Sequence, residues 1–268
     1  MFTRKFIIRA LAVIGIYVAA VSYIFKNEEH FFFNHHEIPI NQSFSYDIPF
    51  KEMNIKLSQE IQLHALLFLQ EKPKGLILFF PSGDYDPLTF KAQNNALYQK
   101  GYSLLIPDYR GTGKSNSKYQ TENDIYIDAQ QWYKMAKSIA DSLPFIIYGN
   151  EFGCGSAAWV GGEYPSDLIL LESPFYSWNK MMLKKYFWWT PHSYLSQFEI
   201  PVWKFIRKST NRIVLIHASD SKFIKYKNSQ ELLEFLKPGD ELITLNSEDK
   251  EQYQENMKKI LSQIIKRN

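Results

Sequence analysis

One short stretch near the middle of the chain constrains its fold more than any other. Residues 146–149 read Ile-Ile-Tyr-Gly, an apolar run typical of a buried parallel strand. Gly149 and Gly153 are separated by three residues in a Gly-x-x-x-Gly pattern, and small residues continue from Cys154 to position 158. Glycines permit a sharp turn, and small side chains let a helix pack closely on a sheet. The stretch therefore predicts a strand, a tight turn and a helix, with Glu151 at the apex of the turn.

Length and composition fit one sizeable globular domain. The chain has 268 residues, of which 45% are hydrophobic and 22% charged. Its formal net charge is +3 and the basic residues are scattered, so no nucleic-acid partner is expected. Cys154 is the only cysteine, which excludes an internal disulfide and a thiolate cluster for zinc. We expect neither a metal nor another cofactor.

The N-terminal stretch predicts one transmembrane helix. Basic residues precede an apolar run that continues to Phe25, which is about the ~20 residues needed to cross a bilayer. We predict that residues 1–26 anchor the chain in the cell membrane as a single pass, with the lipid bilayer as a partner. Because basic residues precede the run and Glu28 and Glu29 follow it, we expect the N-terminus in the cytoplasm and the domain outside it. A cleavable signal peptide with its site at residues 20–22 is the alternative.

A connector and an α/β domain are expected after the anchor. Residues 27–50 show no period and are interpreted as a juxtamembrane connector. His30, His35 and His36 lie there without a carboxylate or cysteine at ligand spacing, so we expect a polar segment and no metal site. In the domain, residues 51–268, strands and helices alternate, which predicts a mainly parallel sheet with helices on both faces.

Strands are expected at residues 53–57, 61–69, 75–80, 103–107, 168–171, 213–216 and 242–245, besides the central one. Helices are expected near residues 89–99, 123–142 and 228–236, with a last one from about residue 250.

Five motifs along the domain resemble the α/β-hydrolase superfamily, most of all its membrane-anchored branch of serine-peptidase-like and lysophospholipase-like proteins. They lie, in order, at residues 78–83, 108–115, 148–155, 171–175 and 215–218. The resemblance implies the α/β-hydrolase fold, and it makes the central turn a nucleophile elbow. In that motif the apex residue is the one that attacks the substrate.

The resemblance also implies a Ser-Asp-His triad, and this sequence departs from it at each position. The nucleophile position holds Glu151. The acid position holds Ser221, with Asp220 one place early. The histidine is expected around residues 246–249, but no histidine follows His217.

The same motifs locate a cleft above the sheet. We expect Ser82, Gly83, Glu151 and Phe152 to line it as binding residues. An aromatic insertion, at about residues 178–209, is expected to form a short lid; covering an apolar ligand pocket or docking on the bilayer are the other interpretations.

Two residues near this cleft have a predicted role of their own. His192, inside the insertion, is the one stand-in for the missing base. Glu151, at a helix start, is expected to act as a cap for free backbone N–H groups. The alternative interpretation is that selection on this position was relaxed after catalysis was lost, so that glutamate has no specific role there.

These features favour a membrane-anchored α/β-hydrolase-fold protein that lacks the triad and serves as a non-catalytic binding or scaffolding pseudoenzyme. Its partner would be an apolar small molecule or another protein. Two alternatives stay open: a hydrolase of ester or amide bonds with a displaced constellation, and a structural subunit of a membrane assembly.

Overall fold

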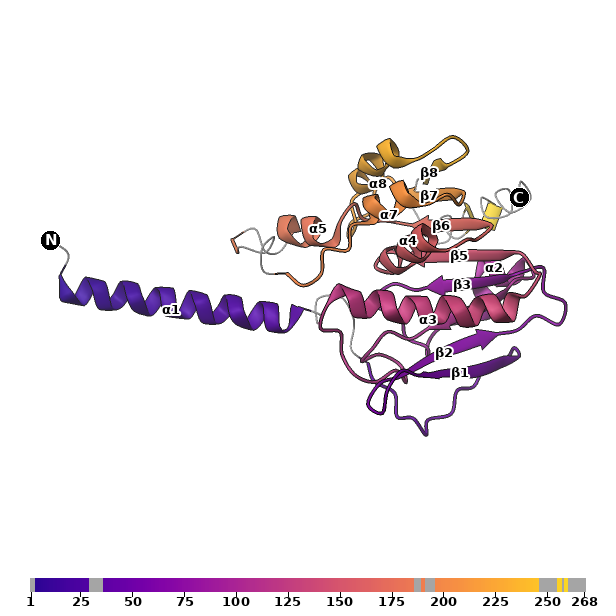
Figure 1. Ribbon diagram of the computed structural model, residues 1–268, viewed down its shortest axis with the longest axis horizontal. Coiled ribbons are helices and arrows are strands. Elements are labelled where there is room, and N and C mark those ends of the chain that lie inside the picture. Colours follow the sequence, from indigo (N-terminus) through magenta and orange to yellow (C-terminus); the bar gives the residue numbers. More distant parts are fainter. Residues whose placement is uncertain are drawn as a thin grey trace.

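An eight-stranded sheet runs through the domain, with strand order β1-β2-β4-β3-β5-β6-β7-β8 (Figure 1). The computed structural model describes residues 3–28, 36–185, 189–190, 196–245, 255–256 and 258–259. Its strands are β1 (Phe50–Lys56), β2 (Gln62–Phe68), β3 (Leu76–Phe80), β4 (Ser103–Pro107), β5 (Phe145–Asn150), β6 (Leu168–Glu172), β7 (Ile213–Ala218) and β8 (Glu241–Leu245). Pairing is antiparallel from β1 to β2 and from β2 to β4, and parallel across the rest. The mainly parallel sheet predicted from the sequence is confirmed.

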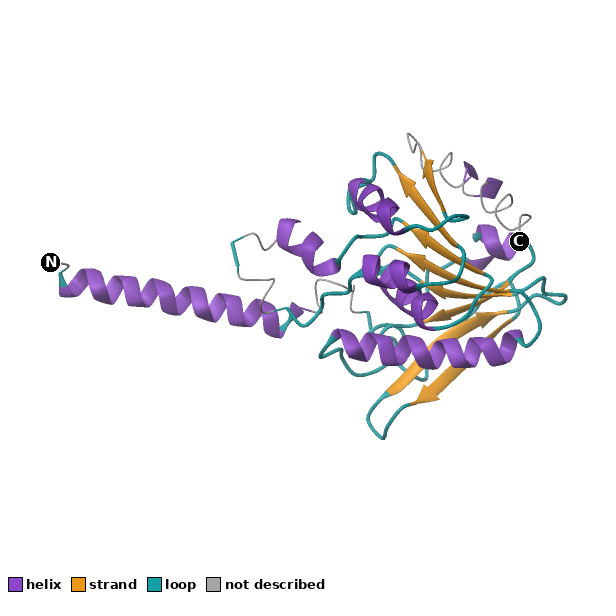
Figure 2. Cartoon of the chain, turned by 45° about the horizontal axis from the view of Figure 1, so that its top comes forward, coloured by secondary structure: helices purple, strands orange, loops and turns teal. Residues whose placement is uncertain are grey.

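Helices lie on both sides of this sheet (Figure 2). The described helices are α1 (Arg4–Lys26), which does not cover the sheet, α2 (Ala96–Gln99), α3 (Glu122–Ala140), α4 (Gly153–Glu163), α5 (Trp178–Lys185), α7 (Val202–Lys208) and α8 (Lys227–Leu232), with 3-10 turns η2 (Ala92–Asn94) and η3 (Leu233–Phe235). Because both faces are covered, the central strands are apolar throughout. In β5, Phe145 and Ile147 join the core under α3 and α4, while Ile146 and Tyr148 join the core under η2 and α2.

Some elements differ from the sequence expectation. The helix expected at residues 89–99 is only η2 followed by one turn, α2. Asn95 separates the two, because its side chain accepts hydrogen bonds from Leu97 N at 2.9 Å and Tyr98 N at 3.3 Å and so caps α2. The helix expected at residues 228–236 is α8 continued by η3. The last expected helix lies mostly outside the described residues.

The described part of the connector packs on the domain. Glu37 forms an isolated parallel β-bridge with Gly113. Ile38 and Phe44 are buried in the core under η2 and α2. In the insertion at residues 178–209, α7 packs on α4, so this part of the insertion belongs to the helical layer over the sheet.

The α1 helix is long and apolar enough to cross a membrane, and only 6% of its most apolar 18-residue stretch is buried in the structure. That exposure excludes a core helix; a signal sequence would pass the same test of length and composition. Figure 1 shows α1 projecting from the domain. Its base is held in place because Glu28, 2% exposed, accepts hydrogen bonds from Ser196 Oγ at 2.5 Å and Gln197 N at 3.3 Å.

The close packing of α4 on β3 gives a first prediction. A Cβ at Gly153 would lie 2.0 Å from the Phe80 carbonyl oxygen. Gly153→Ala should therefore destabilise the domain by about 1–3 kcal/mol, as overpacking of a core does. Thermal unfolding of the full chain in neutral detergent, followed by circular dichroism, measures this. Gly15→Ala is the control, since a Cβ there meets no atom within 4 Å. Equal melting temperatures for both variants would contradict the packing described here.

Candidate functional site

The turn between β5 and α4 has the sharp geometry that its glycines predicted. Glu151 sits at the apex with φ +48°, a left-handed conformation that is uncommon for a residue with a side chain. Its backbone N–H donates to the Glu172 carbonyl oxygen at 2.9 Å. Gly149 has no room for a side chain, because a Cβ would lie 2.7 Å from Ala157 Cβ. The turn therefore holds Glu151 above the end of the sheet in a strained conformation.

A second carboxylate, which the sequence reasoning missed, comes from the next strand. Glu172 ends β6 and pairs in register with Asn150 at the end of β5. The Tyr148 hydroxyl donates a hydrogen bond to the Glu172 carboxylate. The sequence carried the signal, because Glu172 closes a run of four aliphatic residues that was itself predicted to be a buried strand. The end of the sheet beside the elbow is therefore acidic.

Cys154 lies in the first turn of α4 and is fully buried. Its thiol donates to the carbonyl oxygens of Gly149 at 3.3 Å and Glu172 at 3.2 Å. Burial, reinforced by the charges of Glu172 and Glu151, raises the pKa of the Cys154 thiol well above its ordinary value. Since the thiolate is the nucleophilic form, Cys154 is a structural residue.

Of the other residues predicted to line the cleft, Ser82 and Gly83 lie in the loop after β3, and Phe152 lies in the core. Phe80 pairs with Gly149, so the loop carrying Ser82 and Gly83 starts beside the elbow. The Ser82 hydroxyl donates to the Asp84 carboxylate. Both Ser82 and Gly83 are half-buried.

Phe152 is instead a core residue. It is 3% exposed, and its ring packs edge-on against Tyr109 at 5.6 Å and Trp178 at 5.0 Å between centroids. The Tyr109 hydroxyl donates to the Pro81 carbonyl at 2.7 Å, which holds the loop after β3. The side chain of Phe152 thus fills the space above the sheet with aromatic packing.

The other two positions of the expected triad lie at the ends of β7 and β8. Ser221 closes a turn after β7, where its N–H donates to the Ala218 carbonyl at 3.2 Å. Residues 246–250 after β8 lie outside the described part of the chain, and so does His192. Their predicted roles stay predictions.

His217 at the end of β7 is fully buried, and both ring nitrogens are engaged. Nε2 lies 2.8 Å from the Ile224 carbonyl oxygen, and Nδ1 lies 2.7 Å from Ser229 Oγ. Because a carbonyl only accepts, Nε2 carries the proton and the Ser229 hydroxyl donates to Nδ1. Burial lowers the pKa of His217. The ring is therefore a neutral core histidine.

His64 on β2 is also fully buried, between two carboxylates. Its Nδ1 lies 2.7 Å from Asp108 Oδ2 and its Nε2 lies 3.1 Å from Glu52 Oε2. Lys114 completes the cluster, with Nζ 2.6 Å from Glu52 Oε2 and its backbone N–H 2.9 Å from Asp108 Oδ2. This cluster fixes the glycine loop, residues 108–115, to the antiparallel strands.

Arg110 holds the same loop from its other side. Its guanidinium makes two hydrogen bonds to Asp128 on α3, at 2.9 Å and 2.7 Å. A bidentate pair of this kind fixes geometry as well as charge. The third described histidine, His36, is exposed and lies 3.8 Å from Asp86. Among the described residues no group of three or more His, Cys, Asp or Glu side chains is arranged to hold a metal ion.

Comparison with known proteins agrees with this geometry. The family model of the S33 serine aminopeptidases, a hydrolase family, matches residues 71–201, just under half of the chain. No curated protein sequence matches. An esterase of Pyrococcus furiosus is 19% identical with a TM-score of 0.68, covering 88% of this chain and 98% of that chain.

Two further solved structures share the fold. An esterase of Butyrivibrio proteoclasticus with bound ferulic acid is 15% identical, with a TM-score of 0.62 over 80% of this chain and 99% of its own. The acylaminoacyl peptidase of Pyrococcus horikoshii is 14% identical, with a TM-score of 0.59 over 82% of this chain and 41% of its own. The chain has the α/β-hydrolase fold, and its residues 71–201 resemble the S33 serine aminopeptidase family.

The environment of His217 gives a second prediction. Its folded pKa is lowered below the unfolded value of about 6.5, so its contribution to stability is present above that pH and is lost as pH falls toward the folded pKa. The melting temperature of the full chain should drop between about pH 7.5 and about pH 5.5, and His217→Gln should make the drop smaller.

The exposed His36 provides the control for this measurement. His36→Gln should leave the pH profile of the melting temperature unchanged, since that side chain lies at the surface. A His217→Gln profile as steep as that of the unchanged chain would show that protonation of another group limits stability in acid.

Proposed function

We propose that this chain is a membrane-anchored α/β-hydrolase-fold protein that lacks the Ser-Asp-His triad and acts as a non-catalytic binding or scaffolding pseudoenzyme. The observation that carries the proposal is Glu151 at the apex of the elbow, where hydrolases of this fold place the nucleophile. A carboxylate nucleophile would still need a base and a site for the developing negative charge.

The charge at the elbow supports this proposal. Acyl transfer passes through an oxyanion, which hydrolases stabilise with N–H donors at the start of the helix after the nucleophile. Here Glu172 lies beside the elbow, since it pairs with Asn150 and its carbonyl accepts from the Glu151 N–H. Besides burial, which is the main cause, the charges of Glu172 and Glu151 raise the pKa of the Cys154 thiol at the helix start. Two carboxylates would repel an oxyanion. The elbow geometry is therefore retained while its electrostatics oppose the reaction.

The histidines support the proposal as well. A general base needs a ring nitrogen that can reach the nucleophile. In the described part of the chain, His64 and His217 are fully buried with both nitrogens hydrogen-bonded, and His36 lies on the surface beside Asp86. None of these three is available at the elbow.

The competing function is hydrolysis of ester or amide bonds through a displaced constellation. It is favoured by the family model and by the structural neighbours, which include esterases and peptidases. In that case His192 would act as the base.

Hydrolysis of a short-chain aryl ester by the purified full chain in neutral detergent separates these two functions. We expect no turnover above the uncatalysed background. Glu151→Ser should not create activity, because the new hydroxyl would still lack a general base. Labelling with a fluorophosphonate should likewise fail for the unchanged chain.

His192→Ala is the matched variant for the competing function. Turnover that survives Glu151→Ala and disappears with His192→Ala would establish the displaced site and refute the pseudoenzyme. Turnover that disappears with Glu151→Ala would make Glu151 itself catalytic.

We further propose that α1 is retained as a single-pass anchor in the cell membrane and that the domain lies outside the cytoplasm. Basic residues before α1 and acidic residues after it support this orientation. The contact of Tyr17 with Trp189 supports retention, because Tyr17 precedes the alternative cleavage site and its hydroxyl donates to the Trp189 carbonyl at 3.3 Å.

Protease added to intact spheroplasts tests the orientation. We expect the domain to be digested before lysis and a fragment containing α1 to remain with the membrane. Complete protection of the domain would place it in the cytoplasm. A mature N-terminus near Tyr23 would show that the segment is a cleaved signal.

A further inference from the structure

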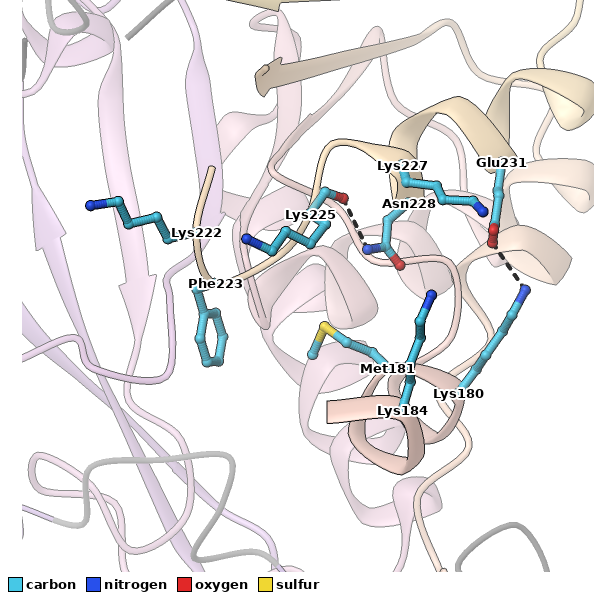
Figure 3. Close-up of a pocket in the computed structure, with 9 residues that line it drawn as sticks. All are labelled: Lys180, Met181, Lys184, Lys222, Phe223, Lys225, Lys227, Asn228 and Glu231. Atoms are coloured by element: carbon cyan, nitrogen blue, oxygen red, sulfur yellow. Dashed lines mark hydrogen bonds and ion pairs between the residues drawn. The ribbon is translucent and has the colours of Figure 1, made fainter. Parts of the chain in front are cut away.

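A pocket of about 410 Å³ lies away from the elbow, between α5 and the segment that follows β7 (Figure 3). Pockets of roughly 300–1,000 Å³ are typical of small-molecule sites. Nine side chains line it: Lys180, Met181, Lys184, Lys222, Phe223, Lys225, Lys227, Asn228 and Glu231. Its volume is within the range of small-molecule sites, and none of its lining residues belongs to the elbow.

The pocket is strongly basic. Five of its nine lining residues are lysines and one is acidic. Lys180 is neutralised, because its Nζ lies 2.9 Å from Glu231 Oε2. For the other four lysines, no ion pair joins them to any residue in the described part of the chain. Like charges gathered around one pocket repel one another, so an anion bound there would stabilise the arrangement.

The same pocket has an apolar side. Met181 is 8% exposed and Phe223 is 39% exposed. Figure 3 shows Lys184 extending from α5 toward the segment that carries Lys225 and Asn228, with Met181 beside it. Lysine amines next to apolar side chains suit an amphiphilic anion better than a small inorganic ion.

The pocket lies on the side of the domain from which α1 projects. Figure 1 shows α5 on that side. Trp189, just beyond α5, contacts α1 directly: the Tyr17 hydroxyl donates to its carbonyl at 3.3 Å, and the two rings meet edge-on at 6.1 Å. Tyr17 lies ~13 Å along the helix from Lys26, at 1.5 Å per residue. When α1 spans a bilayer, this contact places Trp189 at the membrane.

We propose that this lysine pocket binds the phosphate headgroup of an anionic phospholipid from the membrane that α1 crosses. Lys184 and Lys225 would contact the phosphate, while Met181 and Phe223 would contact the glycerol and the first acyl carbons. The proposal rests on the membrane attachment proposed above and does not depend on the loss of catalysis. Basic side chains near a bilayer surface are attracted to anionic lipids in this way.

Binding of water-soluble dihexanoyl phosphatidylglycerol to the full chain in neutral detergent tests the proposal, with titration calorimetry as the readout. We expect binding of this lipid and much weaker binding of dihexanoyl phosphatidylcholine at the same concentration. The double variant Lys184→Glu/Lys225→Glu should weaken the binding of phosphatidylglycerol by about tenfold or more. Lys184→Gln/Lys225→Gln should weaken it less, and it guards against misfolding of the charge-reversed protein.

The matched control is Lys72→Glu/Lys134→Glu, which makes the same change in net charge at two exposed positions outside the pocket. It should bind phosphatidylglycerol like the unchanged chain. Equal weakening by the control, or equal binding of both lipids, would overturn the proposal. Inorganic phosphate that binds as tightly as the lipid would also overturn it, since the ligand would then be a free anion. Hydrolysis of the probe would refute the pseudoenzyme and leave the lipid site unaffected.

Discussion

The contact between the start of α4 and the ends of β3 and β5 is the constraint on which the rest of the structure depends. Gly149 and Gly153 carry no side chain, so the helix lies directly on the sheet, and a single added carbon at Gly153 would meet the Phe80 carbonyl. This contact forces the chain through a turn with φ +48° at Glu151. It also directs the start of the helix toward the ends of the parallel strands, where ligands of open α/β sheets bind. The geometry of the hydrolase elbow is thus a consequence of packing and persists whatever residue occupies its apex.

Polar clusters on either side of the elbow serve the same architecture. His64, Asp108, Glu52 and Lys114 fix the glycine loop to the antiparallel strands, while Arg110 ties it to α3. From residue type alone such groups could be mistaken for catalytic residues, because they include a histidine and several carboxylates. Their mutual hydrogen bonds serve the fold: His64, Asp108, Arg110 and Lys114 are buried, while Glu52 on the edge strand is exposed. The functional surface is better sought where charges are unpaired, and the lysine pocket beside α5 is such a place.

The fold was predictable from the sequence to a large extent, because apolar runs separated by helical patterns describe a buried parallel sheet. The strands were located to within a few residues, and α3 was expected at residues 123–142 and found at Glu122–Ala140. The helix expected at residues 89–99 failed because the capping side chain of Asn95 outweighs apolar spacing over so short a segment. Glu172 was overlooked because strand register, which places it beside Asn150, is a property of the sheet.

The sequence by itself determined that the chain has an apolar N-terminal helix, a strand-turn-helix elbow with glutamate at its apex, and no histidine after His217. These follow from residue identity and from local periodicity, which are the same in any conformation. Only the tertiary structure decided which polar groups are satisfied and which are not. His217 could be recognised as a core residue once Ser229 and Ile224 were placed around it, and the lysines of the pocket come from positions 180–227, which chain order alone does not bring together. Hydrogen bonds and charge repulsion depend on distance in space, and that distance is set by the packing of the sheet.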